Sequence, residues 1–215
     1  MRARAVLFDF DGTLTLPEAI DFAALRASLG VPPGSPILEY IASLPSALDR
    51  ERKHSLLAQW EEAAARASLP NAGAEELLSH LKERGLAAAI LTRNTRRSVE
   101  LALGNFRSTH VTDFAAVVTR EAKARPKPEP DGVYIAAALL KVQPSELLVV
   151  GDFVYDIAAG KAAGARTVLI TNGADAARAA AATRARVGAA VPFVDAAPDH
   201  VITTLAELPP LLDLP

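Results

Sequence analysis

The chain of 215 residues contains no cysteine, and only 5% of its residues are aromatic. The lack of cysteine excludes disulfide bonds, thiolate metal sites and thiol nucleophiles. No apolar run approaches the roughly 18 residues that a membrane-spanning helix needs, and no long apolar segment precedes the first expected strand. The chain also has no strong excess of positive or negative charge: its formal net charge is -2, and Lys and Arg are spread along the sequence. We therefore expect a cytoplasmic protein that binds neither a membrane nor nucleic acid.

Apolar runs typical of buried strands recur along the chain and alternate with helical patterns. The expected strands cover residues 3–8, 87–91, 114–118, 147–150 and 167–170, with a closing strand at 201–202. The expected helices between and after them cover residues 74–85, 131–140, 156–163 and 205–212. This alternation predicts an α/β protein with a doubly wound, Rossmann-like parallel sheet that helices cover on both faces.

Residues 16–71 interrupt this alternation, because they contain no convincing strand. Their patterns predict helices over residues 20–29, 37–44 and 48–69. On the longest helix, Leu48, Leu56, Leu57, Trp60 and Ala64 lie at helical spacing, with Glu61 and Glu62 expected to face away from them. We predict a core of residues 1–15 and 72–215 and a small helical cap of residues 16–71. An alanine-rich run at 174–190 is assigned no function.

Two carboxylates stand at the end of the first buried strand. Asp9 and Asp11 follow the apolar run Ala5-Val6-Leu7-Phe8, and Gly12 permits a sharp turn after them. Alternation along an extended chain places side chains i and i+2 on one face, so both acids point into one space. Like charges this close indicate that a cation or a shared proton compensates them.

Polar and charged residues also follow the next three strands: Thr92, Arg93, Asn94, Lys127, Asp152 and Asp156. A hydroxyl at a strand end, followed by the N–H groups of a helix start, can bind an anion, and a proline-rich loop holds the lysine in place. Because parallel strands present their carboxyl ends at one edge of a sheet, we expect these residues to share one crevice. Four carboxylates against one lysine suit Mg²⁺, and the ion would let the pocket accept a phosphoryl group.

The segment Asp9-Phe10-Asp11-Gly12-Thr13-Leu14-Thr15 resembles the first signature of the haloacid dehalogenase-like (HAD) hydrolase superfamily, in its phosphatase form. The later strand ends are similar to the other three signatures of that superfamily, in the same order. Among its members, capped phosphatases similar to phosphoglycolate phosphatases are the nearest resemblance. The resemblance implies a Mg²⁺-dependent phosphatase acting on a small phosphorylated metabolite.

The resemblance also implies a role for each matching residue. Asp9 is implied as the nucleophile that forms an aspartyl-phosphate, and Asp11 as the general acid and base. Mg²⁺ is implied on Asp9, the backbone carbonyl of Asp11, and Asp152. Thr92 and Lys127 then hold the phosphoryl oxygens, and Asp156 orients Lys127 or a metal-bound water. Arg93 and Asn94 are further candidates for binding the substrate.

Two other functions share these residues. A phosphomutase of the β-phosphoglucomutase type carries the same four motifs and returns the phosphoryl group to a sugar rather than to water. A phosphorylated signalling receiver also has an acidic Mg²⁺ pocket with a Thr and a Lys. In a receiver, however, the phosphorylated Asp follows the acidic pair on a later strand, and no cap is required. The sequence leaves the oligomeric state and the identity of the substrate open.

Overall fold

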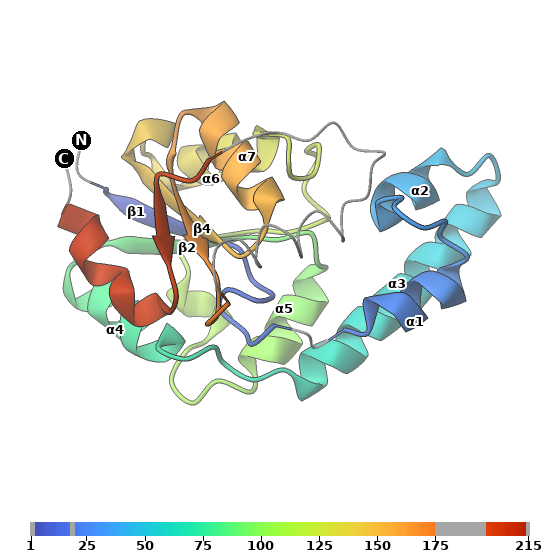
Figure 1. Cartoon of the computed structure of the whole chain (residues 1–215), viewed down its shortest axis with the longest axis horizontal. Coiled ribbons are helices and arrows are strands. Elements are labelled where there is room, and N and C mark those ends of the chain that lie inside the picture. Colours follow the sequence, from blue (N-terminus) through green and yellow to red (C-terminus); the bar gives the residue numbers. More distant parts are fainter. Residues whose placement is uncertain (1–2, 18–19, 175–196, 214–215) are drawn as a thin grey trace.

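A computed structural model describes residues 3–17, 20–174 and 197–213 of the chain (Figure 1). The alanine-rich run lies outside these residues from position 175 onward. Six parallel strands form one sheet in the order β3-β2-β1-β4-β5-β6. They are β1 (Ala5–Phe8), β2 (Ala87–Leu91), β3 (Ala116–Val118), β4 (Leu147–Gly151), β5 (Arg166–Ile170) and β6 (His200–Ile202). The predicted parallel sheet is confirmed, and each expected strand is present.

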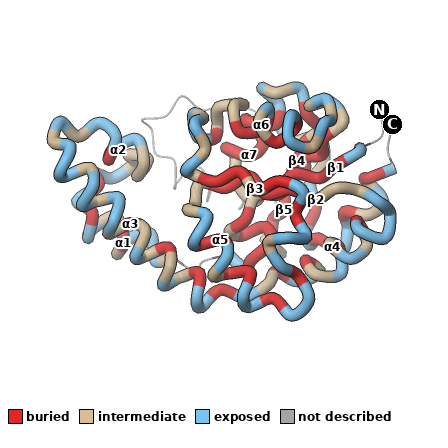
Figure 2. The backbone as a smooth tube through the Cα atoms, turned by 180° about the vertical axis from the view of Figure 1, so that it is seen from behind, coloured by how far each residue is buried: buried red, intermediate tan, exposed pale blue. Residues whose placement is uncertain are grey.

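Helices cover both faces of this sheet (Figure 1). They are α4 (Ala74–Glu83) and α5 (Arg96–Leu103) on one face, and α6 (Asp131–Leu140) and α7 (Val154–Ala163) on the other. Alternate side chains of β1 serve the two layers: Val6 and Phe8 pack in the first core and Ala5 and Leu7 in the second. Burial on both sides explains the uninterrupted apolar run of each central strand. Buried residues accordingly gather along the strands in Figure 2.

The end of the described chain differs from the predicted single helix over residues 205–212. Two short 3₁₀ helices, Leu205–Glu207 and Pro209–Asp213, take its place. Pro209 and Pro210 lack the amide N–H groups that α-helical hydrogen bonds would use, so the chain tightens into 3₁₀ turns. The buried leucines of this segment still pack on the core beside α4.

Three helices lie between β1 and α4, as the patterns predicted: α1 (Phe22–Leu29), α2 (Ile37–Ser43) and α3 (Ala47–Ala67). They enclose a small apolar core of their own, whose fully buried members include Leu25, Leu29 and Ile41. Asp21 and Ser46 cap the first turns of α1 and α3 through side-chain oxygens. We refer to residues 20–69 as the helical segment.

Helix α3 connects the helical segment to the sheet domain. Its last turns pack against α5, while its first turns extend away from the sheet (Figure 1). The side chain of Asn105 donates hydrogen bonds to the carbonyls of Ala65 and Ser68, at 3.0 and 2.9 Å, and so satisfies the helix end. At the other end, Leu48 is 54% exposed, which contradicts its predicted place in the apolar stripe.

The register of the sheet places three strand ends side by side. Phe8 pairs with Ile90 on one neighbour and with Val150 on the other. The residues that follow these strands therefore emerge together at the carboxyl edge, where open α/β sheets bind their ligands. None of the helices in the described part of the chain combines the length and the apolarity needed to cross a bilayer.

Candidate active site

The turn after β1 is held against the end of β4. Gly12 has a φ of +76°, and its carbonyl accepts a hydrogen bond from the Asn172 side chain at 2.6 Å. The Asn71 side chain donates to the Thr13 carbonyl at 2.9 Å and to the Asn172 side-chain oxygen. A Cβ atom on Gly12 would lie 2.4 Å from Oδ2 of Asp152, so only glycine allows this approach. The turn thereby brings the first acidic motif against the fourth.

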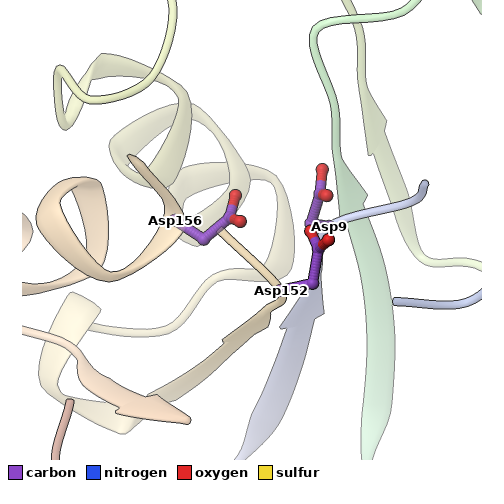
Figure 3. Close-up of side chains that lie close together, drawn as sticks. All are labelled: Asp9, Asp152 and Asp156. Atoms are coloured by element: carbon purple, nitrogen blue, oxygen red, sulfur yellow. The ribbon is translucent and has the colours of Figure 1, made fainter. Parts of the chain in front are cut away.

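Three carboxylates gather where β1 and β4 end. Asp9 follows β1, Asp152 follows β4, and Asp156 comes from the first turn of α7 (Figure 3). One oxygen from each lies within 4.8 Å of the others, and Asp156 is buried. Oxygen ligands of this kind suit a hard divalent cation. This cluster could hold a metal ion.

Lys127 places a positive charge among these carboxylates. Its Nζ donates to Oδ1 of Asp9 at 2.6 Å, to Oδ1 of Asp156 at 2.5 Å and to the Leu91 carbonyl at 3.0 Å. Burial by itself would lower the pKa of this lysine, but the charges of Asp156 and Asp9 outweigh it and raise the pKa. Lys127 is 6% exposed and remains a buried cation.

Asp156 uses both of its oxygens. Oδ1 binds Lys127, and Oδ2 accepts a hydrogen bond from the Phe153 N–H at 3.1 Å, which caps the start of α7. Asp156 therefore stabilises the N-terminus of α7 and contacts Lys127 at the same time. Burial, followed by the nearby Asp9 charge, raises the pKa of Asp156, and Lys127 opposes this rise.

Replacing Gly151 with alanine is expected to lower kcat about 100-fold, because it displaces Asp156. A Cβ atom at this position would lie 2.3 Å from both Cβ and Cγ of Asp156, whose carboxylate is fixed at both oxygens. A displacement of about 1 Å can cost this much in rate. Steady-state kinetics of the Gly151→Ala variant would measure the effect.

Gly160→Ala is the matched control for this glycine. Its Cβ atom would lie 2.6 Å from Cγ2 of Thr167, inside the core and away from the carboxylates. Overpacking there should cost about 1–3 kcal/mol of unfolding free energy while kcat stays within about twofold. Equal kcat values for the two variants would show that Gly151 serves packing alone.

Asp11 lies beside the turn that follows β2. The Asn94 side chain donates to Oδ2 of Asp11 at 2.7 Å, and the Asn94 N–H donates to the Thr92 hydroxyl at 3.1 Å. Burial raises the pKa of Asp11 to about 6, the Asn94 hydrogen bond opposes this rise, and the Asp9 charge adds to it. The Asp11 carboxyl is thus held in place by the Thr92–Asn94 turn.

A cavity of about 240 Å³ lies between the strand ends and the helical segment. All eight residues singled out from the sequence line it: Asp9, Asp11, Thr92, Arg93, Asn94, Lys127, Asp152 and Asp156. The opposite wall comes from the helical segment and includes Phe22, Leu25 and Leu57. The structure therefore brings four motifs, far apart in the sequence, to one pocket.

Arg93 contacts the helical segment rather than solvent alone. Its Nη2 donates to both carboxylate oxygens of Glu39 on α2, at 2.6 and 2.8 Å. The guanidinium carbon lies 5.6 Å from the centre of the Tyr155 ring. Arg93 thus ties α2 to the strand ends while it lines the cavity.

Three charged residues of the cavity wall were not identified from the sequence as site residues: Arg26, Glu61 and Arg120. Arg120, which follows β3, donates from Nη2 to Oε1 of Glu61 on α3. The prediction that Glu61 faces away from the apolar stripe is wrong, because Glu61 is 6% exposed and lies in the same buried row as Leu57 and Ala65. The spacing of four between these three residues was the signal that could have placed it.

Comparison with known proteins identifies the class. A family model described as haloacid dehalogenase-like hydrolase matches residues 3–164, and a HAD-hydrolase-like model matches residues 124–208. The chain belongs to the haloacid dehalogenase-like hydrolases, as its motifs predicted.

Individual relatives agree with this assignment. An uncharacterized hydrolase of Saccharomyces cerevisiae is 34% identical, covering 79% of this chain and 78% of its own. Phosphoglycolate phosphatase 1 of Pseudomonas aeruginosa is 27% identical, covering 98% of this chain and 80% of its own. The crystal structure of a hydrolase from Pseudomonas syringae has the same fold, with a TM-score of 0.76, 22% identity, and coverage of 99% of this chain and 98% of the other. The predicted resemblance to phosphoglycolate phosphatases is thereby confirmed.

Proposed function

We propose that the protein is a Mg²⁺-dependent phosphatase that hydrolyses a small phosphate monoester through an aspartyl-phosphate on Asp9. One observation carries this proposal: the Asp9 carboxylate lines a cavity together with the buried Lys127, which it contacts, and with a second carboxylate, that of Asp152. Such a site can hold a phosphoryl group by positioning and electrostatic stabilisation, which phosphoryl transfer chiefly requires. Membership of the hydrolase family and the phosphatase relatives support the same class of reaction.

Mg²⁺ fits the residues at the strand ends. Asp9, the backbone carbonyl of Asp11 and Asp152 would hold the ion, and these donors are all oxygens. Asp156 is already engaged by Lys127 and by the start of α7, which favours a positioning role for it. When bound, the ion offsets the charge of the carboxylates and of the incoming phosphoryl group.

The proposed reaction has two steps. In the first, a carboxylate oxygen of Asp9 attacks phosphorus, the bond to the ester oxygen breaks, and Asp11 donates a proton to the leaving alcohol. In the second, Asp11 takes a proton from a water molecule, which attacks phosphorus and releases inorganic phosphate and Asp9. Thr92 and Lys127 hold the phosphoryl oxygens, while Asn94 fixes the Asp11 carboxyl.

We further propose that residues 16–71 act as a cap over a core of residues 1–15 and 72–215. The helical segment supplies apolar side chains such as Phe22 and Leu57 to the cavity wall, opposite the carboxylates. A wall of this kind excludes water from the reacting groups and limits the size of the substrate. The volume of about 240 Å³ favours a small metabolite over a folded protein.

Phosphate release from a panel of small phosphate monoesters is expected in the presence of Mg²⁺. Addition of EDTA should lower the rate at least about 100-fold, and restored Mg²⁺ should recover it. A colorimetric assay for inorganic phosphate measures both. Transfer of the phosphoryl group to a sugar without phosphate release would identify a phosphomutase, and a stable phosphorylated protein without turnover would identify a signalling switch.

A further inference from the structure

Glu61 and Arg120 form an ion pair across the cavity, between α3 of the helical segment and the loop after β3. Both residues line the same cavity as Asp9 and Asp11. None of the motifs assigned to phosphoryl transfer includes them. The pair therefore belongs to the part of the cavity that remains for the rest of the substrate.

One oxygen of this pair lacks a partner. Oε1 of Glu61 accepts from Arg120, whereas Oε2 is buried and has no hydrogen-bond partner among the described residues. Leaving a buried carboxylate oxygen unpaired costs free energy, so such an oxygen indicates a missing donor. Burial raises the pKa of Glu61 to about 7 against the opposing effect of Arg120, and the Asp11 charge adds to the rise. Glu61 and Asp11 line the same cavity.

Arg120 is fixed to the turn that positions Asp11. Its Nε donates to the Arg93 carbonyl at 2.9 Å, and its backbone N–H donates to the Asn94 carbonyl at 2.9 Å. Asn94 in turn holds the Asp11 carboxyl. The ion pair is therefore built into the same frame as the proposed general acid, which acts on the leaving alcohol.

We propose that Glu61 and Arg120 recognise a hydroxyl group on the leaving alcohol, so that the substrate is a small polyol or sugar phosphate. This inference rests on the proposed phosphatase function. A hydroxyl can donate to Oε2 of Glu61 and can accept from a guanidinium at the same time. A neutral hydroxyl can satisfy both members of the pair, whereas an ammonium can only donate and a carboxylate can only accept. A leaving group that bears a carboxylate in place of the hydroxyl, as in phosphoglycolate, would leave Oε2 of Glu61 without a donor.

The test compares substrates and variants. The panel holds glycerol 1-phosphate, erythritol 4-phosphate and ribose 5-phosphate, with 2-phosphoglycolate as the carboxylate and acetyl phosphate as a reference without a hydroxyl. The wild-type protein is expected to prefer the best hydroxylated ester over 2-phosphoglycolate at least about 10-fold in kcat/KM. For each variant we compare kcat/KM for that ester with kcat/KM for acetyl phosphate. In Glu61→Gln this ratio should fall about 10–100-fold, mainly because KM for the hydroxylated ester rises.

Glu62→Gln is the matched control. Glu62 is the next residue on α3 and pairs with Arg66 on the surface, so this variant should keep the wild-type ratio. Circular dichroism and the thermal midpoint report whether each variant is folded. If Glu61→Gln does not fold, the substrate preference of the wild-type protein decides the question alone.

The outcomes separate the two proposals. If the wild-type protein with Mg²⁺ hydrolyses neither any of the esters nor the acyl phosphate acetyl phosphate, the phosphatase function is overturned. If acetyl phosphate is hydrolysed but 2-phosphoglycolate is the best ester, only the hydroxyl recognition is overturned. The hydroxyl recognition is also overturned if the folded Glu61→Gln variant keeps the wild-type ratio of the two kcat/KM values.

Discussion

Asp9→Asn is expected to lower kcat more than about 10⁴-fold while the protein stays folded. The amide that replaces the carboxylate is similar in size but cannot attack phosphorus under these conditions. Lys127 keeps its bonds to Asp156 and to the Leu91 carbonyl, so the surrounding structure loses little support. Phosphate release and circular dichroism would measure the two parts of this expectation.

A labelling experiment examines the covalent step directly. Wild-type protein quenched in acid during turnover of a ³²P-labelled ester should retain label, and Asp9→Asn should retain none. Asp113→Asn is a suitable control, because this aspartate bonds Lys82 and His110 just before β3, at the opposite edge of the sheet. Turnover by Asp9→Asn at more than about one hundredth of the wild-type rate would contradict an Asp9 nucleophile.

Lys127→Met is expected to abolish turnover and to lower the free energy of unfolding by about 3–5 kcal/mol. The methionine side chain fills similar space but leaves two carboxylates, those of Asp9 and Asp156, without the cation that offsets them. Urea unfolding at pH 7 would measure the loss. We expect saturating Mg²⁺ to recover part of it, because an ion bound by the carboxylates offsets the same charge.

Two further variants separate this charge effect from general damage. Lys82→Met removes a surface lysine that is paired with Asp113, and it should cost less than about 1 kcal/mol. In the double variant Lys127→Met, Asp156→Asn, removal of the second charge should return part of the lost stability. Wild-type stability in Lys127→Met would show that the buried cation does not compensate the carboxylates.

The strand ends were predictable because the central strands are buried on both faces. Such strands appear as short, unbroken apolar runs, so the first polar residue after each run marks the edge of the sheet. Asp9, Thr92 and Asp152 each occupy that position, and parallel pairing aligns them. These three residues and the other five candidates line one cavity. Their chemical roles, the division into core and cap, and the cytoplasmic location stay predictions.

The wall contributed by the helical segment was harder to predict. Glu61 is charged, and a charged residue on an amphipathic helix normally faces solvent. Its burial depends on Arg120, which lies 59 positions further along the chain and reaches Glu61 only after both elements have packed. Leu48 shows the opposite deviation. It is apolar and belongs to the predicted stripe, yet it is exposed because the apolar core of the helical segment does not extend to it. Periodicity describes one helix and carries no information on its partner.

The docking of α3 by one end has a mechanical consequence. A helix of 21 residues is stiff and about 31 Å long, and only its last turns are held against α5. A tilt of about 10° at that end would carry the far tip through about 5 Å, but would move Glu61, about 9 Å from the held end, by less than about 2 Å. Such a tilt would separate Glu39 on α2 from Arg93, whereas Glu61 and Arg120 would move apart much less. The two ion pairs that join the helical segment to the strand ends would therefore respond differently to the same movement of α3.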